Sequence, residues 1–181
     1  EEKQLIMAKA DDPSAPVREA CAQIIGKHLS KGGQPVLLQL ISDRRSASEN
    51  GIFRFYVPNF HVARAAAFSF GRLGQLKKPI IDGIIEFLGR RNPRRDDPLV
   101  HYYLVDAVAG QRDSRVLPLL EDFLSDSWYM PGTKNEGFPL RYAAAWGIAE
   151  QFLDNPSNRE KVDPEALYNG AIHSDGRLAG P

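Results

Sequence analysis

Residues 16–26 read Pro-Val-Arg-Glu-Ala-Cys-Ala-Gln-Ile-Ile-Gly, and this stretch decides the fold. Its apolar and small residues recur at the i, i+3, i+4, i+7, i+8 spacing of a helix with one buried face. Alanine is the strongest helix former, and a proline at the first position of a helix costs no hydrogen bond. The run of small residues from Ala20 to Ala22 allows a neighbouring helix to approach closely. The stretch therefore predicts a helix that packs tightly against another helix.

The same pattern returns three times. The copies begin near 17, 62, 100 and 140, so the periods are 45, 38 and 40 residues. A second apolar pattern follows the first three copies, at 37–41, 84–88 and 120–124. Two-helix repeats with periods of roughly 40–47 residues stack into solenoids. We therefore predict an all-α chain, built as a right-handed α-solenoid of about four two-helix repeats, with long loops after the first and third repeats.

Prolines and capping residues indicate where some of these helices begin. Pro118 lies inside the third second helix and should kink it or delay its start. Asp163-Pro164-Glu165 has the residue types of a helix N-terminus and predicts a fourth second helix that runs to about Ile172. Leu5 to Ala8 has the character of the remnant of a preceding second helix.

The 181 residues can bury a core of their own, and we expect one repeat domain over 1–173 and a C-terminal tail over 174–181. The chain starts at Glu1 rather than Met, so we expect it to be a piece of a longer protein. One cysteine excludes a disulfide framework. No apolar run approaches the ~20 residues that span a bilayer, and no signal peptide is visible. These features predict a cytoplasmic protein.

The string at 16–26, followed by a short turn and a leucine-rich helix that ends in Ser42-Asp43, resembles HEAT-like repeats of the phycobilisome-lyase type. The resemblance covers roughly residues 13–172. It implies a ladder of arginine–aspartate pairs, and the positions that match this ladder are Arg18, Asp43, Asp126 and Arg141. It also implies that copies two and three lack the ladder, because arginine shifts to the third position in copy two and is absent from copy three.

The loops from second to first helices are long, at 43–61, 89–98 and 126–139, and we expect them on one edge of the stacked hairpins. They combine arginine with aromatic residues, which are the types enriched at binding hot spots. The aromatic side chains have a second interpretation, in which they fold back and cover a helix pair. The candidate partner-binding residues are Arg44, Arg45, Phe53, Arg54, Phe55, Tyr56, Arg90, Arg91, Arg94, Arg95, Trp128 and Tyr129.

No motif for catalysis or metal binding stands out. None of the four histidines lies three or four residues from another, and the chain has no Cys-x-x-Cys, Walker-type or Gly-x-Ser-x-Gly sequence. Cys21 falls at a small-residue packing position, which favours a buried structural thiol over a nucleophile. We therefore expect no metal, no cofactor and no enzyme activity.

These observations favour a non-catalytic protein–protein interaction module or scaffold, whose partner is another protein. The alternative is a solenoid that binds nucleic acid or phosphate through the arginine-rich loops, since arginine is a good bidentate phosphate ligand. A phycobilin-lyase-like enzyme is a third hypothesis and rests on the resemblance alone. No membrane partner is expected.

The formal net charge of zero hides a separation of charge along the chain. Residues 44–95 carry 11 basic and 3 acidic side chains, whereas residues 96–181 carry 7 basic and 14 acidic ones. The basic block favours an anionic partner surface or nucleic acid at 44–95. The opposite charges also permit head-to-tail self-association, which is a heterologous contact.

Overall fold

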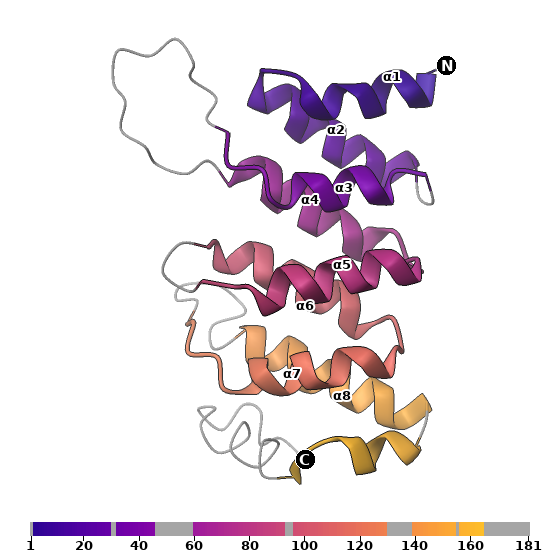
Figure 1. Ribbon diagram of the computed structural model, residues 1–181, viewed down its shortest axis with the longest axis vertical. Coiled ribbons are helices and arrows are strands. Elements are labelled where there is room, and N and C mark those ends of the chain that lie inside the picture. The colour runs from indigo at the N-terminus through magenta and orange to yellow at the C-terminus, as the bar shows by residue number, and fades with distance from the viewer. Residues whose placement is uncertain are drawn as a thin grey trace. The chain divides into compact units, whose positions relative to one another are not determined.

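The computed structural model describes residues 2–29, 32–45, 60–92, 96–129, 139–154 and 156–164. These residues form helices, with no strand among them (Figure 1). The α-helices are α1 (Glu2–Ala8), α2 (Ala15–His28), α3 (Gln34–Leu40), α4 (His61–Arg72), α5 (Lys78–Gly89), α6 (Pro98–Ala109), α7 (Leu117–Leu124) and α8 (Pro139–Asp154). Three short 3-10 helices are η1 (Lys9–Asp11), η2 (Ser114–Val116) and η3 (Pro156–Lys161). The predicted all-α fold is confirmed.

The helices follow the predicted repeat. The four first helices are α2, α4, α6 and α8, and the second helices of the first three repeats are α3, α5 and α7. The remnant predicted at Leu5 to Ala8 is part of α1. Helix α2 packs on α1, α3 and α4, and α7 packs on α8, which is the neighbour-to-neighbour packing of an α-solenoid.

Prolines mark the helix starts as predicted. Pro98 and Pro139 are the first residues of α6 and α8, and Pro16 lies in the first turn of α2. Pro118 delays the start of its helix, because α7 begins at Leu117 directly after η2. A proline at these positions removes only an amide that has no partner within the helix.

The chain divides into two compact units, and the boundary passes through α5 and α6. The first unit holds residues 1–84 and 93–104, and the second holds 85–92 and 105–181. In the first unit α2 packs closely on α4, because the glycine at Gly26 leaves room for Ser69. A Cβ atom on Gly26 would lie 2.5 Å from the Ser69 Cβ, and Ser69 donates a 3.0 Å hydrogen bond to the Ala22 carbonyl.

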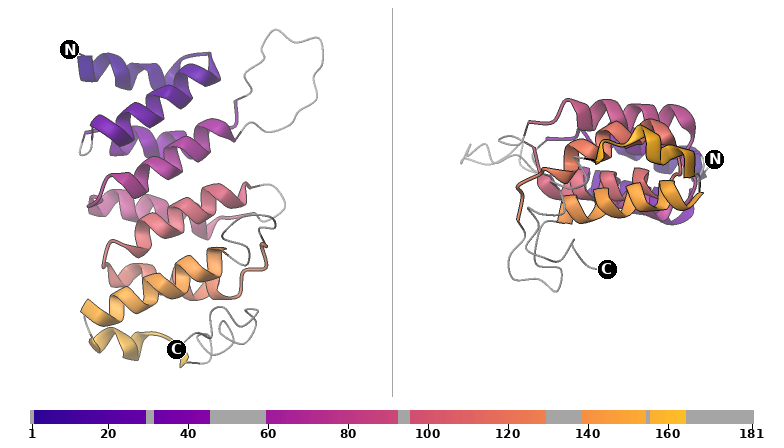
Figure 2. Two further views of the ribbon diagram at one scale, coloured as in Figure 1. Left: turned by 180° about the vertical axis from the view of Figure 1, so that it is seen from behind. Right: turned by 90° about the horizontal axis from the view of Figure 1, so that it is seen from below.

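The second unit repeats this close approach. A Cβ atom on Gly147 of α8 would lie 2.5 Å from the Ala109 Cβ, at the end of α6. Helix α8 also packs on α7, which contributes the buried Leu120 and Phe123, and Leu120 lies beside the same glycine. Figure 1 shows α7 in front of α8, and the reverse view in Figure 2 shows α8 in front. The small residues therefore bring first helices together in both units, as the sequence predicts.

Several predicted features fall on segments that the structure leaves undescribed. The helix expected from Asp163 to Ile172 is described only to Pro164. Most of the three long loops lies at 46–59, 93–95 and 130–138, outside the described residues. Within the described residues, no helix is long and apolar enough to cross a membrane.

Candidate functional site

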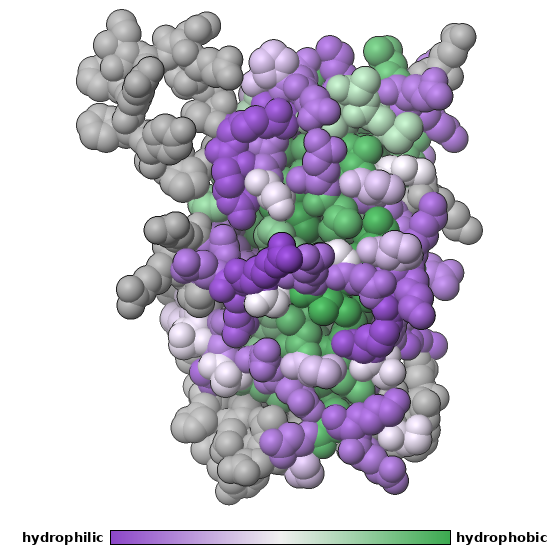
Figure 3. All heavy atoms as spheres, viewed as in Figure 1, coloured by the Kyte–Doolittle hydropathy of each residue, from purple (hydrophilic) through white to green (hydrophobic). Residues whose placement is uncertain are grey.

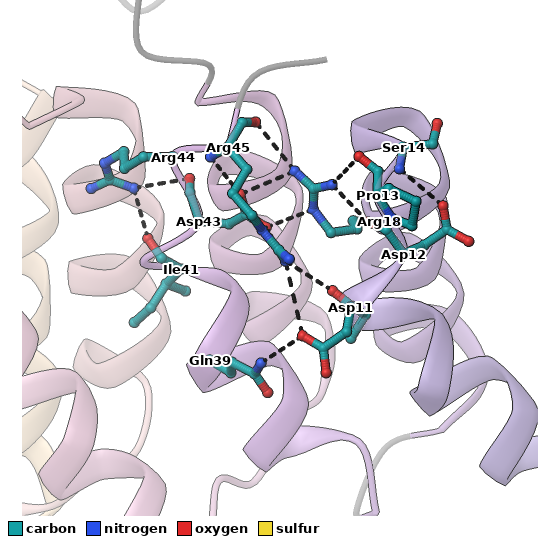
Figure 4. A network of polar contacts seen from close by, with 11 residues as sticks. Asp11, Asp12, Pro13, Ser14, Arg18, Gln39, Ile41, Asp43, Arg44 and Arg45 are labelled. Atoms are coloured by element: carbon teal, nitrogen blue, oxygen red, sulfur yellow. Dashed lines mark hydrogen bonds and ion pairs between the residues drawn. The ribbon is translucent and has the colours of Figure 1, made fainter. Parts of the chain in front are cut away.

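Arg18 on α2 is buried, and all five of its guanidinium N–H donors have partners (Figure 4). Its Nε and Nη2 donate to the two carboxylate oxygens of Asp43, at 2.7 and 3.3 Å. Its Nη1 donates to the carbonyls of Asp12 and Pro13, at 2.8 and 2.9 Å, and Nη2 also reaches the Arg45 carbonyl at 3.2 Å. The side chain thus fixes the chain before α2 to the chain after α3.

Asp43 is the acceptor at the centre of this network. Its carboxylate also accepts hydrogen bonds from the main-chain N–H of Arg45 at 2.9 Å and from the Nε and Nη2 of the same residue. Burial by itself would raise the pKa of Asp43, but the hydrogen bonds from Arg45 and then from Arg18 outweigh it and hold the pKa below its ordinary value. Asp43 is therefore a carboxylate at neutral pH, and it fixes the first residues of the following loop.

Arg44 holds the two ends of that loop together. Its guanidinium lies over the ring of Phe60, 4.8 Å from the centroid, and donates hydrogen bonds to the carbonyls of Ile41 and Asp43. A longer ion pair of 3.7 Å joins it to Asp96. Phe60 directly precedes α4, so the described residues that flank segment 46–59 lie close together.

A hollow of about 260 Å³ lies beside this base. Arg45 borders it and has 50% of its side chain exposed, and its Nη2 donates to the Ala10 carbonyl at 3.2 Å. The same guanidinium is 4.0 Å from Asp11, whose carboxylate accepts a hydrogen bond from Gln39. Residues from α3, η1 and the loop line the hollow: Asp11, Gln39, Leu40, Ser42, Asp43, Arg44 and Arg45.

Copy two also has an arginine–aspartate pair, which corrects the expectation that it lacks one. Arg64 on α4 donates from Nε and Nη2 to the carboxylate of Asp97, at 3.1 and 2.5 Å. The hydrogen bond to Asp97 raises the pKa of Arg64. Asp97 also accepts the main-chain N–H groups of Leu99 and Val100 and so caps α6. Arg64 lies one position later in its repeat than Arg18 does, and its aspartate partner lies just before the next first helix, α6.

Asp126 in the second unit contacts two arginines, and neither contact is the predicted side-chain pair with Arg141. Arg141 on α8 donates to the main-chain carbonyl of Asp126, so the predicted pair meets through the backbone. The Asp126 carboxylate lies 3.6 Å from the Nη1 of Arg91, which stands over the Phe123 ring at 4.0 Å from the centroid. The first helix of copy three, α6, has no arginine, and the arginine that contacts Asp126 comes instead from the preceding loop.

The remaining described candidates are Arg90, Trp128 and Tyr129. Arg90 forms an i, i+4 ion pair with Glu86 at 2.5 Å. The main-chain N–H of Trp128 donates to Asp126, and Tyr129 is 46% exposed. Arg44 and Arg45 belong to the first unit, and the described candidates at 90, 91, 128 and 129 belong to the second. The other candidates lie outside the described residues: Phe53, Arg54, Phe55, Tyr56, Arg94 and Arg95.

The sequence patterns did not single out the exposed apolar side chains on the first helices. The face seen in Figure 3 carries mostly hydrophilic residues, with apolar ones visible between the helices. By contrast, α4 exposes Phe68, and α8 exposes Tyr142, Trp146 and Leu153. The spacing i, i+4 and i+11 on α8 was the signal, but it is hidden because α8 has a second apolar face that is buried.

Cys21 is buried, as predicted, and its thiol donates to the Ile6 carbonyl at 3.0 Å. Burial raises the pKa of the Cys21 thiol, which disfavours the nucleophilic thiolate. No group of three or more histidine, cysteine, aspartate or glutamate side chains that could hold a metal ion occurs in the described part of the chain. The chemistry of the described site is therefore that of arginine–carboxylate pairs and aromatic rings.

No family model matches this chain, and no curated protein matches it. Solved structures do match, and one of them is the complex of CpcE and CpcF of phycocyanin lyase from Nostoc sp. PCC7120. The TM-score is 0.60 at 17% sequence identity, and the match covers 93% of this chain. This chain spans 62% of the length of the matched chain. The likeness confirms the HEAT-like repeat fold.

The match also corrects one expectation. The absence of catalytic motifs led to the prediction that the chain is not an enzyme, and the match contradicts that prediction. The matched structure is of a phycocyanin lyase, which is an enzyme, so this fold does not exclude catalysis. The same structure is a complex of two different proteins, CpcE and CpcF.

Proposed function

We propose that this chain is a subunit of a protein assembly and binds another protein through the loops that follow its second helices. One observation carries the proposal. The buried guanidinium of Arg18 uses all of its donors to hold the segment before α2 against the segment after α3. Arg44 then closes the base of segment 46–59 over Phe60. A fixed base lowers the entropy that a binding segment loses when it meets a partner.

The composition of the loops supports a protein rather than a phosphate as the partner. Segment 46–59 contains Phe53, Phe55 and Tyr56, and aromatic residues with arginine dominate protein-binding hot spots. The described arginines of these loops, by contrast, are already matched by carboxylates. Their charges are partly neutralised, which weakens the attraction for a polyanion.

The test is a comparison of affinity-purified assemblies from cells that express the wild-type chain or a variant with Phe53, Arg54, Phe55 and Tyr56 changed to serine. A protein that co-purifies with the wild type should be lost from the variant, and titration calorimetry with the purified partner should show the same loss. A Lys9→Ala variant, changed at an exposed ion pair on η1, is the matched control. Equal recovery with the serine variant would refute the role of the loop, as would tight binding of DNA or RNA at about 50 mM salt with no protein partner.

A second candidate function is lyase activity on a phycobilin-carrying protein, and the match to the phycocyanin lyase structure favours it. In this function the chain would act with a second repeat protein, as in the matched complex. The measurement is the visible absorption spectrum of phycocyanin incubated with the purified chain, alone and with a co-expressed partner. A change in the chromophore spectrum supports the activity, and an unchanged spectrum with both proteins present rules it out.

A further inference from the structure

Helix α8 carries apolar side chains on two opposite faces. One face is buried and includes Ala144 and Ile148, which lie on the packed side of the helix. The other face carries Tyr142, Trp146 and Leu153, which are 63, 42 and 77% exposed. An apolar face of a helix is normally covered by another element. Tyrosine and tryptophan side chains grouped on an exposed surface indicate an interaction site.

The charged residues that α8 and α6 carry on their solvent side near this stripe are acidic. Glu150 lies on α8 between Trp146 and Leu153, and Asp106 is exposed on α6 one turn before Ala109, the residue that contacts α8. Arg141 is the basic residue of α8 and is buried. We call the surface of Tyr142, Trp146, Leu153, Glu150 and Asp106 the acidic face.

The first helices of the first unit form a surface of the opposite charge. Helix α2 exposes Val17 and Ile24, at 36 and 38%, and Lys27 follows one turn after Ile24. Helix α4, which packs beside α2, exposes Phe68, and the guanidinium of Arg72 lies 5.7 Å from the centre of that ring. We call the surface of these five residues the basic face.

We propose that the acidic face of one copy of this chain binds the basic face of a second copy. Each face joins exposed apolar side chains to charges of one sign, and the two signs are opposite. The net charges of the two units have the same signs as their faces. The first unit has 14 basic and 10 acidic residues, and the second has 9 basic and 13 acidic residues. Apolar contact supplies affinity, and the charges select the partner face. The contact is heterologous, because the two faces differ.

This contact goes beyond the proposed function. It uses the helices rather than the loops, and it shares no residue with the candidate partner-binding residues. Lys27, Arg72, Asp106 and Glu150 are outside the arginine–aspartate network that holds the repeat together. Changes in these four side chains therefore test self-association separately from the binding of another protein.

The first experiment is sedimentation velocity of the wild-type chain between about 1 and 100 µM, the range in which moderate protein contacts form. The weight-average mass should rise with concentration, and the rise should shrink at about 1 M salt, where charges are screened within roughly 3 Å. Trp146→Asp should weaken the association about thirtyfold or more, the effect of losing a hot-spot residue. Circular dichroism then shows that the variant is folded. A monomeric wild-type chain at every concentration would overturn the proposal.

The decisive experiment exchanges the charges. A chain with Lys27→Glu and Arg72→Glu has two acidic faces, and a chain with Asp106→Lys and Glu150→Lys has two basic faces. Each variant alone should remain monomeric, whereas a mixture should associate, because each face then meets its opposite. The matched control reverses two exposed charges away from both faces, Lys78→Glu on α5 and Asp122→Lys on α7. Failure of the mixture to associate, or an equal loss in the control, contradicts the proposal.

Discussion

The guanidinium of Arg18 and the carboxylate of Asp43 form a two-point contact, with Nε 2.7 Å from Oδ2 and Nη2 3.3 Å from Oδ1. The two side chains are 0 and 3% exposed, so the contact is shielded from water. A buried charge is costly unless a partner and hydrogen bonds compensate for it. This pair meets that condition, because the guanidinium also reaches three main-chain carbonyls.

Removal of the guanidinium should destabilise the first unit strongly. Arg18→Met keeps much of the side-chain volume but leaves the Asp43 carboxylate with one arginine and leaves the main-chain carbonyls of Asp12 and Pro13 without their donor. We expect a loss of about 3–5 kcal/mol in the free energy of unfolding. Urea denaturation followed by circular dichroism measures it. Lys9→Ala removes an ion pair whose lysine is half exposed, and it should change the free energy of unfolding by less than about 1 kcal/mol. A similar loss in both variants would contradict the stabilising role of the Arg18 guanidinium.

Stability should fall in acid because of Asp43. The folded pKa of this carboxyl is below its ordinary value, so its contribution is complete above the unfolded pKa of about 3.9 and is lost as the pH falls through the folded pKa. Asp43→Asn should lower stability at pH 7, and the gap from the wild type should narrow between about pH 5 and pH 2. Urea midpoints measured over that range give the gap. A gap that stays constant would show that Asp43 does not titrate with unfolding.

The close approach of α2 and α4 makes Gly26 sensitive to a single methyl group. Gly26→Ala places a Cβ 2.5 Å from the side chain of Ser69 and 3.0 Å from its Cα, so the helices must separate. We expect a loss of about 1–3 kcal/mol, despite the higher helix propensity of alanine. Differential scanning calorimetry measures the melting temperature. Gly89→Ala is the control, since its new Cβ meets nothing within 4 Å, and it should be nearly neutral.

Gly74 should resist substitution for a different reason. Its φ is +69°, in the left-handed region that favours glycine, although a Cβ there meets nothing within 4 Å. Gly74→Ala should cost about 1–2 kcal/mol from backbone strain alone. The melting temperature reports the cost. Gly32→Ala, also without a neighbour but without a positive φ, should have little effect, and equal losses in both would refute the strain.

The repeat and its helix starts could be predicted because they depend on local properties. Alanine runs favour helix and close packing, and proline at 16, 98 and 139 is tolerated within a helix only in its first turn. The same local logic predicted a kink or a delayed start at Pro118, and the structure places it in the first turn of α7. These signals depend on residues within one turn of each other, so no knowledge of the distant chain is needed.

The arginine–aspartate pairs could be predicted only in part, because a salt bridge depends on where two distant segments meet. Arg64 is displaced by one position from Arg18, yet it finds Asp97 at the next helix start. Arg91 reaches Asp126 from a loop and has no counterpart in the repeat pattern. The exposed stripe of α8 was missed for a related reason: periodicity identifies apolar faces, and α8 has two of them.

The contact of Arg44 with Phe60 has a consequence for how this repeat can change. Arg44 contacts Phe60 and the Ile41 carbonyl, so described residues on the two sides of segment 46–59 are held together. The entropy of closing such a segment grows slowly with length, by about 0.6 kcal/mol for each doubling. A change in the length of this segment should therefore add little closure entropy, which makes the position suited to accepting insertions and to grafting an engineered binding peptide.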